Sequence, residues 1–431
     1  MLLEIEKLVY GGDGLARLGG DSAGPGKAVF VPFVLDGEKI EASVLEKNRG
    51  YDRAKVDRIL EPSPNRVEPQ CSYYQACGGC QYQHSSYAHQ LETKAAILKE
   101  NLRRIAKMEL ETELVTHASP PWNYRNRTRL KLRLEPEFAL GYYKFGSHEL
   151  LPVERCPISS PLLNRAIAQL WQAGRADKIP PGIEEVELFA DSDDEHLLIE
   201  IYCARSTTGE AANGIGGAVR SAIAECTGAI VFRTQRAGTE PDVVARKGAG
   251  ALTYNTDGGQ FQVSAGSFFQ VNRFLIDELV NIVTARQSGK LALDLYCGVG
   301  LFSLVLAKTF AQVISVESSP TAYSDLLYNA KANIRAVHAA VDRFLNQGSR
   351  ELQPDLVVVD PPRGGLGEVV VRSLGRLGAR QVTYISCDPA TLSRDLAGLL
   401  NAGYRIQRAR VVDLFPQTFH IESVFELVRT G

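Results

Sequence analysis

The 431-residue sequence lacks several features that define whole classes of protein. It contains no run of roughly 20 apolar residues, the length that a helix needs to cross a bilayer, so we expect no membrane partner. The first residues, Met1–Lys7, include acids where a secretory signal has a basic start and an apolar core, and we therefore expect a cytoplasmic protein. Eight cysteines are too few for a disulfide scaffold in a chain of this length.

A strong excess of charge is also missing. The formal net charge is −2 at pH 7, which argues against a protein that binds every polyanion without selectivity. A local basic groove is compatible with this value, because electrostatic binding depends on how charge is distributed. The length and an apolar fraction of 45% fit a globular protein of about two to four domains.

Residues 1–60 have the pattern of a small all-β domain. Short apolar runs at 27–32, 40–45 and 53–60 alternate with glycine-rich turns, which is typical of a small β-barrel. The proline-rich stretch 61–69 then predicts a linker.

Residues 61–270 predict a central α+β domain. The spacing of apolar residues indicates a helix at 88–107 and strands from 122 to about 250. Within this region three cysteines follow the linker at once, and a fourth lies near residue 156.

Residues 271–431 predict an α/β domain with a Rossmann-like, doubly wound sheet. A helix is expected at 274–287, and from residue 290 strand and helix patterns alternate. The strand candidates are 291–297, 312–318, 335–341, 356–360, 381–386, 404–414 and 421–428. Since the last two follow each other closely, we expect an antiparallel pair at one edge of the sheet.

The first strand of this sheet leads into a glycine turn that indicates a cofactor site. Asp294 precedes Gly298 and Gly300, and Glu317 ends the next strand, where an acid can accept hydrogen bonds from both ribose hydroxyls. A dinucleotide site normally has three glycines spaced for a pyrophosphate. The acid and the two glycines here suit S-adenosylmethionine, which has no phosphates and carries positive charge.

Three other residues lie where predicted strands begin or end and could carry chemistry. Cys387 follows the strand 381–386, Asp360 follows the strand 356–359, and Glu422 lies 35 residues after Cys387. A thiolate added to C6 of uracil makes C5 nucleophilic toward a methyl sulfonium, and a base must then remove the C5 proton. We therefore predict Cys387 as a nucleophile of lowered pKa, Glu422 as the base and Asp360 as the acceptor of uracil N3–H.

Structural interpretations of the same acids compete with these roles. Asp360 could instead cap a rigid turn, and Glu422 could be a solvated acid on an edge strand. That second interpretation is the one we prefer for Glu426.

The four clustered thiols indicate a metal site. Cys71, Cys77 and Cys80 are spaced Cys-x5-Cys-x2-Cys, and Cys156 is followed by proline. A structural zinc site usually has two paired knuckles, whereas three clustered thiols and a distant fourth are typical of a 4Fe–4S cluster. We predict the cluster and keep zinc as the alternative.

The segment 122–133 predicts an RNA contact. Its basic residues alternate, so a strand would align them on one face: Arg125, Arg127, Arg129, Lys131 and Arg133. Such a face can track phosphates while Tyr124 or Trp122 stacks on bases. The alternative is a charged face turned to solvent.

Together these residues resemble the RNA uracil-5-methyltransferases, specifically the iron–sulfur branch that modifies 23S ribosomal RNA. The resemblance covers essentially the whole chain. It implies that 1–60 is a TRAM domain that binds RNA, that 271–431 is a class I methyltransferase domain, and that the four cysteines ligate the cluster. The nucleophile motif is similar to 386–391, and the base motif is similar to 420–423.

The resemblance also implies residues that contact the cofactor. These are Gln270, Tyr296, Gly298, Gly300, Glu317 and Asp360. Two positions depart from the family pattern, since Leu301 and Ala340 stand where polar residues are common, and Asp342 could substitute for the second.

The expected activity is S-adenosylmethionine-dependent methylation of uridine C5 in 23S RNA that is unassembled or partly folded, by a monomeric enzyme. The closest alternative is the same reaction on the T-loop of transfer RNA. A non-catalytic RNA-binding or ribosome-assembly protein is the alternative from another class. DNA cytosine methylation fits less well, because Ser386 rather than proline precedes the thiol.

Overall fold

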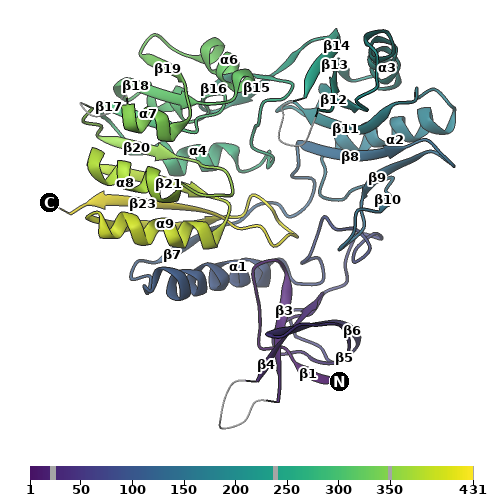
Figure 1. The fold of residues 1–431 in the computed structure, drawn as a ribbon, viewed down its shortest axis with the longest axis horizontal. Coiled ribbons are helices and arrows are strands. Elements are labelled where there is room, and N and C mark those ends of the chain that lie inside the picture. Colours follow the sequence, from purple (N-terminus) through teal and green to yellow (C-terminus); the bar gives the residue numbers. More distant parts are fainter. Residues whose placement is uncertain (20–25, 236–240, 348–351, 431) are drawn as a thin grey trace.

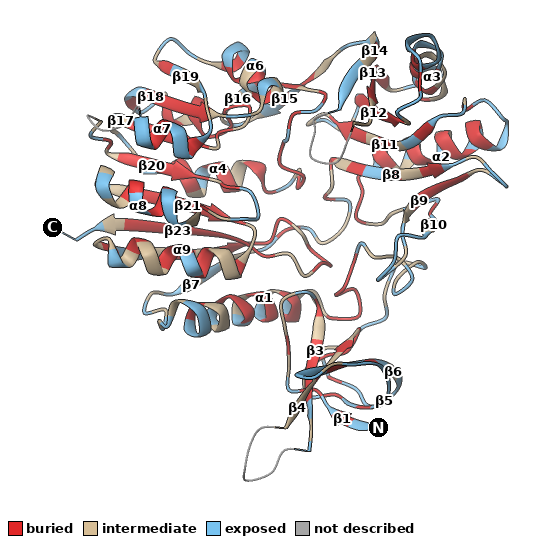
Figure 2. Ribbon diagram, viewed as in Figure 1, coloured by how far each residue is buried: buried red, intermediate tan, exposed pale blue. Residues whose placement is uncertain are grey.

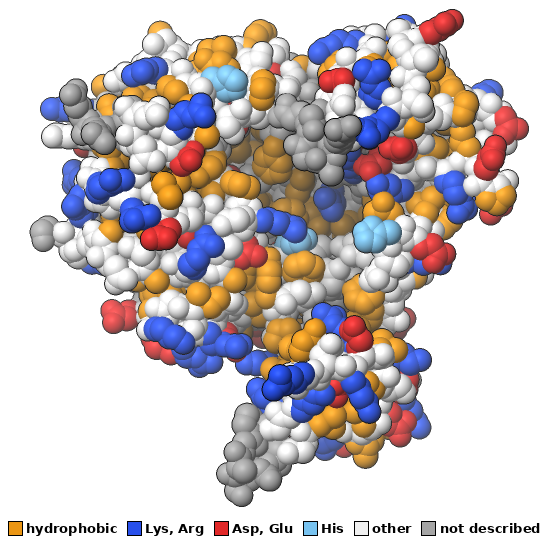
Figure 3. Space-filling view, in the orientation of Figure 1, with side chains coloured by type: hydrophobic (Ala, Val, Ile, Leu, Met, Phe, Trp, Pro, Cys, Tyr) orange, Lys and Arg blue, Asp and Glu red, His pale blue; other side chains and the backbone are white. Residues whose placement is uncertain are grey.

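The computed structural model describes residues 1–19, 26–235, 241–347 and 352–430. They form three units, namely an N-terminal β unit, a central unit and a C-terminal α/β unit (Figure 1). The surface is hollowed where the central and C-terminal units face each other (Figure 3). Among the described residues, no helix is both long enough and apolar enough to cross a bilayer.

The N-terminal unit is a curled, barrel-like sheet, as the apolar runs predict. Its described strands pair in the order β1-β5-β6-β4-β3-β2. Their bounds are β1 Leu2–Glu4, β2 Lys7–Leu8, β3 Asp13–Leu18, β4 Lys27–Pro32, β5 Lys39–Lys47 and β6 Tyr51–Glu61. The core is small, and a Cβ at Gly14 would lie 2.4 Å from a methyl carbon of Val34, so this close approach requires glycine.

The expected helix after the linker is confirmed. It is α1 (Tyr87–Asn101), which continues into a π-helical turn at Leu102–Ala106 and ends at Lys107 in the left-handed conformation. The cysteine-rich segment that precedes α1 contains turns rather than helices or strands.

The central unit is a layer of helices on a mixed sheet with the order β10-β9-β8-β11-β12-β13-β14. The strands are β8 Arg127–Arg133, β9 Ala139–Tyr143, β10 Leu150–Pro152, β11 Ile183–Ala190, β12 Leu197–Cys203, β13 Cys226–Arg233 and β14 Asp242–Gly248. Two helices, α2 (Pro161–Arg175) and α3 (Gly209–Ala222), pack their buried faces on this sheet (Figure 2).

The expectation of strands alone over 122–250 is therefore wrong at these two helices. Each begins with a local signal that marks a helix start. The Ser160 side chain accepts from the Leu163 N–H and is followed by proline, and the Thr208 side chain accepts from the Ala211 N–H.

The C-terminal unit contains the predicted doubly wound sheet, with the order β19-β18-β17-β20-β21-β23-β22-β7. The strands are β7 Leu114–His117, β17 Gly289–Leu295, β18 Phe310–Glu317, β19 Ile334–His338, β20 Leu356–Val359, β21 Gln381–Ser386, β22 Tyr404–Val412 and β23 Glu422–Arg429. Its helices are α4 Ile276–Thr284, α5 Ser303–Leu306, α6 Pro320–Asn329, α7 Val341–Gln347, α8 Gly367–Leu377 and α9 Pro389–Asn401. Separate apolar clusters cover the two faces of this sheet.

Two segments before residue 271 belong to this unit by packing. Strand β7 pairs with β22 in parallel, so the antiparallel pair β22–β23 is one strand inside the edge, contrary to expectation. The hairpin of β15 (Ala251–Thr256) and β16 (Gly259–Ser264) shares an apolar cluster with α4 and β17. The unit thus extends beyond the boundary expected at 271.

A buried ion pair joins α1 to the end of β22. The Nζ of Lys94 lies 2.6 Å from Oδ1 of Asp413, and both side chains are fully buried. Lys94 also donates to the carbonyl of Phe415. Burial lowers the pKa of Lys94, and the negative charge of Asp413 opposes that shift.

Replacing Lys94 with methionine leaves Asp413 as an unpaired buried charge, and we expect this to lower the free energy of unfolding by about 3–5 kcal/mol. The double variant Lys94→Met/Asp413→Leu should recover most of that loss, because no buried charge is left unpaired. Urea unfolding measures both. Lys144→Met, which removes the exposed pair with Glu149, is the control and should change little. Equal effects at Lys94 and Lys144 would contradict the assignment.

Candidate active site

The direction of the strands brings the predicted catalytic residues to one edge of the sheet, meaning here the rim where β20 and β21 finish and β23 starts, not an outermost strand. Strands β20 and β21 are parallel, so Asp360 and Cys387 follow them at the same edge. Strand β23 runs antiparallel to β21, so its first residue, Glu422, begins at that edge. Ser386 pairs with Ser423, which places the nucleophile and base motifs on adjacent strands.

The three side chains form a desolvated acidic group. Burial raises the pKa of Glu422 well above its usual value, and nearby Asp360 raises it further. Burial, with a contribution from Asp294, raises the pKa of Asp360 to about 7. Burial raises the pKa of Cys387 to about 12, Glu422 and Asp360 add to the shift, and Arg363 opposes it.

The expectation that Cys387 has a lowered pKa is therefore wrong for the protein alone. Two carboxyl groups in a water-poor site disfavour a third negative charge on the thiol. Positive charge brought next to this group would favour the ionised forms of all three residues.

The N-terminal unit reaches the same edge. The hydroxyl of Tyr10 donates to the carbonyl of Cys387 at 3.3 Å, and its ring packs edge-on against Phe419 at 5.4 Å. Tyr10 lies 377 positions from Cys387, and no local pattern indicates this contact.

The motifs around Asp360 and Glu422 do contain Arg363 and His420, to which sequence reasoning gave no role.

The glycine turn after β17 has the conformation that a close-approaching ligand requires. Gly298 and Gly300 have φ values of 55° and 93°, and no atom lies within 4 Å of where a Cβ on Gly298 would be. Glu317 accepts a 2.9 Å hydrogen bond from the Gly298 N–H, which fixes the turn against the end of β18. Tyr296, with a φ of 62°, is half-buried beside it.

Three other residues that the sequence places at the cofactor site differ in their surroundings. Gln270 is buried, and the segment before it is held to α6 by Asp325, which accepts from the Ser264 N–H and the Ser267 hydroxyl. Leu301 packs in the apolar core instead of facing the turn. Asp342 is exposed. The pKa of Tyr296 is raised to about 12, mainly by the burial of Tyr296 itself and next by the negative charge of Asp342.

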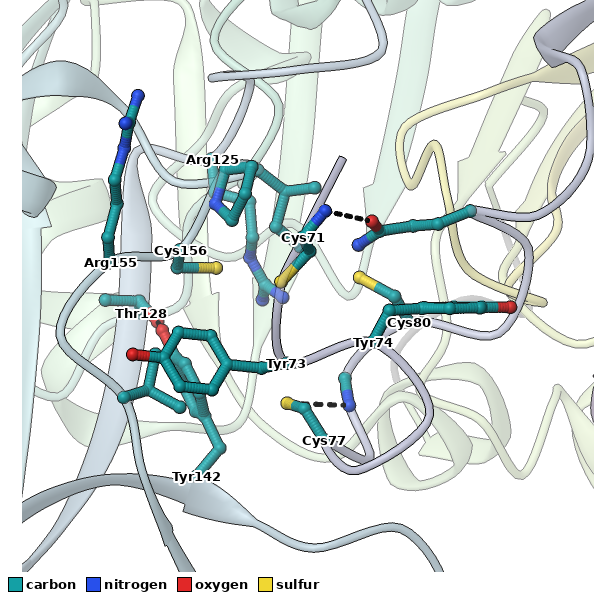
Figure 4. Close-up of a pocket in the computed structure, with 15 residues that line it drawn as sticks. Cys71, Tyr73, Tyr74, Cys77, Cys80, Arg125, Thr128, Tyr142, Arg155 and Cys156 are labelled. Carbon is teal, nitrogen blue, oxygen red and sulfur yellow. Dashed lines mark hydrogen bonds between the residues drawn. The ribbon is translucent and has the colours of Figure 1, made fainter. Parts of the chain in front are cut away.

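The four predicted metal-ligating thiols line one cavity of about 90 Å³ between the cysteine-rich segment and the central unit. Figure 4 shows Cys71, Cys77, Cys80 and Cys156 around this space. Burial raises the pKa of Cys77 to about 11 and raises that of Cys80 further. Among the described residues, no three His, Cys, Asp or Glu side chains are gathered as they would be around a single bound ion.

The predicted RNA contacts are only partly where sequence reasoning put them. Tyr124 is fully buried and donates to the carbonyl of Pro416 at 3.1 Å, so stacking of its ring on a base is excluded. Arg125 lines the thiol cavity. Arg127 and Arg129 do share one face of β8, but the neighbouring strand β11 supplies glutamates that pair with both.

The interpretation of Glu426 is also wrong. Because β22 and β23 lie inside the sheet, Glu426 is buried rather than solvated, with an exposed fraction of 2%. Arg408 and Arg410 on β22 pair with its carboxylate.

Comparison with known proteins identifies the family. The sequence model of the tRNA (uracil-5-)-methyltransferase family matches residues 86–430. The chain belongs to this family. The chain is 34% identical over 430 residues to an uncharacterized RNA methyltransferase of Aquifex aeolicus, covering 98% of this chain and 97% of that protein.

Two further comparisons concern proteins of named activity. The chain is 33% identical to the 23S rRNA (uracil(1939)-C(5))-methyltransferase RlmD of Chromohalobacter salexigens, over 99% of this chain and 89% of that protein. The Pyrococcus abyssi tRNA (uracil-54, C5)-methyltransferase, solved with S-adenosyl-L-homocysteine, has the same fold. Its TM-score is 0.75 at 24% identity, and the match covers 99% of this chain and all of that one.

The buried carboxyl of Asp294 predicts a pH-dependent contribution to stability. Burial raises its pKa from 3.8 to about 7, and its Oδ1 has no hydrogen-bond partner. Above pH 4 the unfolded chain releases this proton before the folded protein does, so stability falls until the pH passes about 7.

The variant Asp294→Asn has no carboxyl group at this position and should not show this fall of stability with rising pH. Its free energy of unfolding, relative to the natural protein, should increase between pH 4 and pH 8 by up to about 4 kcal/mol. Urea unfolding at several pH values measures the difference. The exposed Asp193→Asn variant controls for the loss of one negative charge, and a pH-independent difference at Asp294 would refute the assignment.

Proposed function

We propose that this methyltransferase methylates C5 of a uridine in 23S ribosomal RNA through a covalent bond between Cys387 and C6 of the base. The observation that supports the chemistry is the convergence of a thiol, a buried acid that needs a raised pH to ionise, and a second acid of raised pKa at one sheet edge. The choice of RNA is supported by 33% identity to an enzyme named for 23S RNA, over 99% of the chain. The uracil must leave its stack to reach the half-buried thiol of Cys387.

Each residue of the acidic group has one task. The Cys387 thiolate bonds to C6, and the electron pair of the C5–C6 double bond moves onto C5 and the O4 carbonyl. S-adenosylmethionine, when bound, would supply the methyl group that C5 takes, and the broken S–CH3 bond would leave its electron pair on the sulfur of S-adenosyl-L-homocysteine. The Glu422 carboxylate then takes the C5 proton, the double bond re-forms and the thiolate leaves. Asp360 accepts N3–H of uracil, which cytosine lacks.

Charge explains why the acidic group becomes active only in the complex. When bound, S-adenosylmethionine would bring the positive charge of its sulfonium to this group and would favour the ionised forms of Cys387, Asp360 and Glu422, as Arg363 already does for Cys387. The residues that would hold the cofactor are Glu317 at the ribose, Tyr296 beside the adenosyl group, the Gly298–Gly300 turn and Gln270.

We also propose that Cys71, Cys77, Cys80 and Cys156 hold a 4Fe–4S cluster. A cavity of about 90 Å³ is larger than a single zinc ion needs, since one water occupies only about 10–15 Å³ on this measure. Arg125 lines it, and its buried Nε has no hydrogen-bond partner. A cationic side chain suits a cluster whose four thiolates give net negative charge.

Protein purified without oxygen should contain about four irons and about four sulfides per chain. Cys71→Ser and Cys156→Ser should reduce both contents, whereas Cys203→Ser, at a buried cysteine far from the cavity, should leave them unchanged. Iron and sulfide analysis with visible absorption makes the measurement. One zinc per chain, without sulfide, would overturn the cluster assignment.

The reaction is tested with purified protein, labelled S-adenosylmethionine and transcripts of 23S RNA and transfer RNA. Cys387→Ala should give neither 5-methyluridine nor adduct. Glu422→Gln should form the adduct but release product about 10²–10⁴-fold more slowly, so protein–RNA complexes that survive denaturing gels should accumulate.

The substrate result separates the alternatives. The family description and the Pyrococcus structure both name transfer RNA, so methylation of that transcript alone would keep the mechanism and replace the substrate. A Cys387→Ala variant with full activity in cells would favour the non-catalytic role.

A further inference from the structure

The loop between β22 and β23, residues 413–421, leads directly to Glu422 and is held by backbone carbonyls that face other parts of the chain. Phe415 O accepts from Lys94 Nζ at 2.9 Å. Pro416 O accepts from the Tyr124 hydroxyl at 3.1 Å. Three consecutive carbonyls are bonded in this way, because Gln417 O accepts from two backbone N–H groups of the cysteine-rich segment.

Gln417 is the most constrained residue of this loop. Its φ of 68° lies in the left-handed region, which a residue other than glycine adopts rarely and keeps only when its surroundings hold it. Its carbonyl accepts from the N–H groups of Gln81 and Tyr82, both at 3.0 Å. Its side chain is buried, with an exposed fraction of 3%.

Gln90 on α1 binds Gln417 through both ends of its amide. The Gln90 Oε1 accepts from the Gln417 N–H at 2.9 Å, and the Gln90 Nε2 donates to the Gln417 Oε1 at 3.0 Å. The same Nε2 lies within hydrogen-bond distance of the Tyr82 and Ser85 carbonyls. Gln90 therefore ties the loop and the cysteine-rich segment to one side chain that is almost fully buried.

The contacts continue into the turn that carries two of the thiols. Gln81 follows Cys80 directly, and its Nε2 donates to the carbonyl of Gly78, between Cys77 and Cys80, at 2.9 Å. Its Oε1 accepts from the Phe419 N–H at 3.4 Å. A short series of hydrogen bonds thus runs from the thiol turn to the residues just before Glu422.

We propose that Gln417 is a positioning residue for Glu422, held by Gln81 and Gln90, and that it couples the conformation of the four-cysteine segment to proton removal from C5. This inference rests on the proposed function and gives the cysteine segment a task in catalysis. The nucleophile has a support of its own, because Asp388 caps α9 beside Cys387 by accepting from Ala390 and Thr391 N–H groups. Its link to the loop is indirect and passes through Tyr10, which bonds the Cys387 carbonyl and packs on Phe419. Disturbing the glutamines therefore slows elimination and leaves thiolate addition nearly unchanged.

Two variants test this with different risks to folding. Gln90→Met keeps the size of the side chain and removes its amide. Gln417→Gly removes the hydrogen bond between the two glutamine side chains. Glycine also adopts the left-handed conformation without strain but is free to take other backbone conformations. Gln169→Met is the matched control, since Gln169 also joins two segments, by bonds to Ala224 and Glu225, in the central unit.

Single-turnover assays with RNA should show adduct formation within about two-fold of the natural enzyme for both variants, and elimination slowed about ten-fold, less than for complete loss of the base. Denaturing gels should show the adduct accumulating, as for Glu422→Gln. A variant that only weakens the fold would lower both rates together. Gln169→Met should change neither.

Hydrogen exchange provides a readout that needs no turnover. Exchange at 413–422 should rise in Gln90→Met, in Gln417→Gly and in protein whose thiol-bound metal has been removed by a chelator, while exchange in α9 stays constant. If Glu422→Gln traps adduct but both glutamine variants behave like Gln169→Met, the inference is wrong. If Glu422→Gln traps none, the proposed role of the base fails instead.

Discussion

The direction of three strands decides where this enzyme can carry out chemistry. Side chains that follow parallel strands meet at one sheet edge, and an antiparallel strand brings its first residue to that same edge. Asp360 follows β20, and Cys387 follows β21. Glu422 is the first residue of β23, which lies between β21 and β22 in the sheet. The glycine turn and Glu317 follow β17 and β18 at this edge too, so cofactor residues and reacting groups share one rim of the sheet.

That arrangement has an electrostatic cost that the ligands relieve. Asp294, Asp360, Glu422 and Cys387 are crowded where water is scarce, and each acid has a raised pKa. Burial favours the neutral forms of these groups in the protein alone, and added positive charge would favour the ionised forms.

The base is held by segments that are distant in the chain. Tyr10 of the N-terminal unit, Tyr124 of the central unit, and Lys94 and Gln90 of α1 all contact the loop before Glu422 or the residues beside it. Phe419 packs against Tyr10, and Tyr10 also bonds the carbonyl of Cys387. The two outer units are therefore in direct contact with the edge of the sheet that carries Cys387 and Glu422.

Local patterns in the sequence were sufficient for the strands of the α/β unit, for the helix α1 and for the residues at the strand ends, because alternation, glycine turns and capping depend on neighbours along the chain. They were not sufficient for burial or pairing across the chain. Tyr124 lies between Asn123 and Arg125, and Glu426 carries a charge itself, yet tertiary packing buries both. Strand β7 joins the sheet by pairing Leu114 with Ala409, 295 positions later (409 minus 114), and Gln90 bonds Gln417 across 327 positions. Such contacts depend on which surfaces meet when the units pack, and no short-range pattern encodes that.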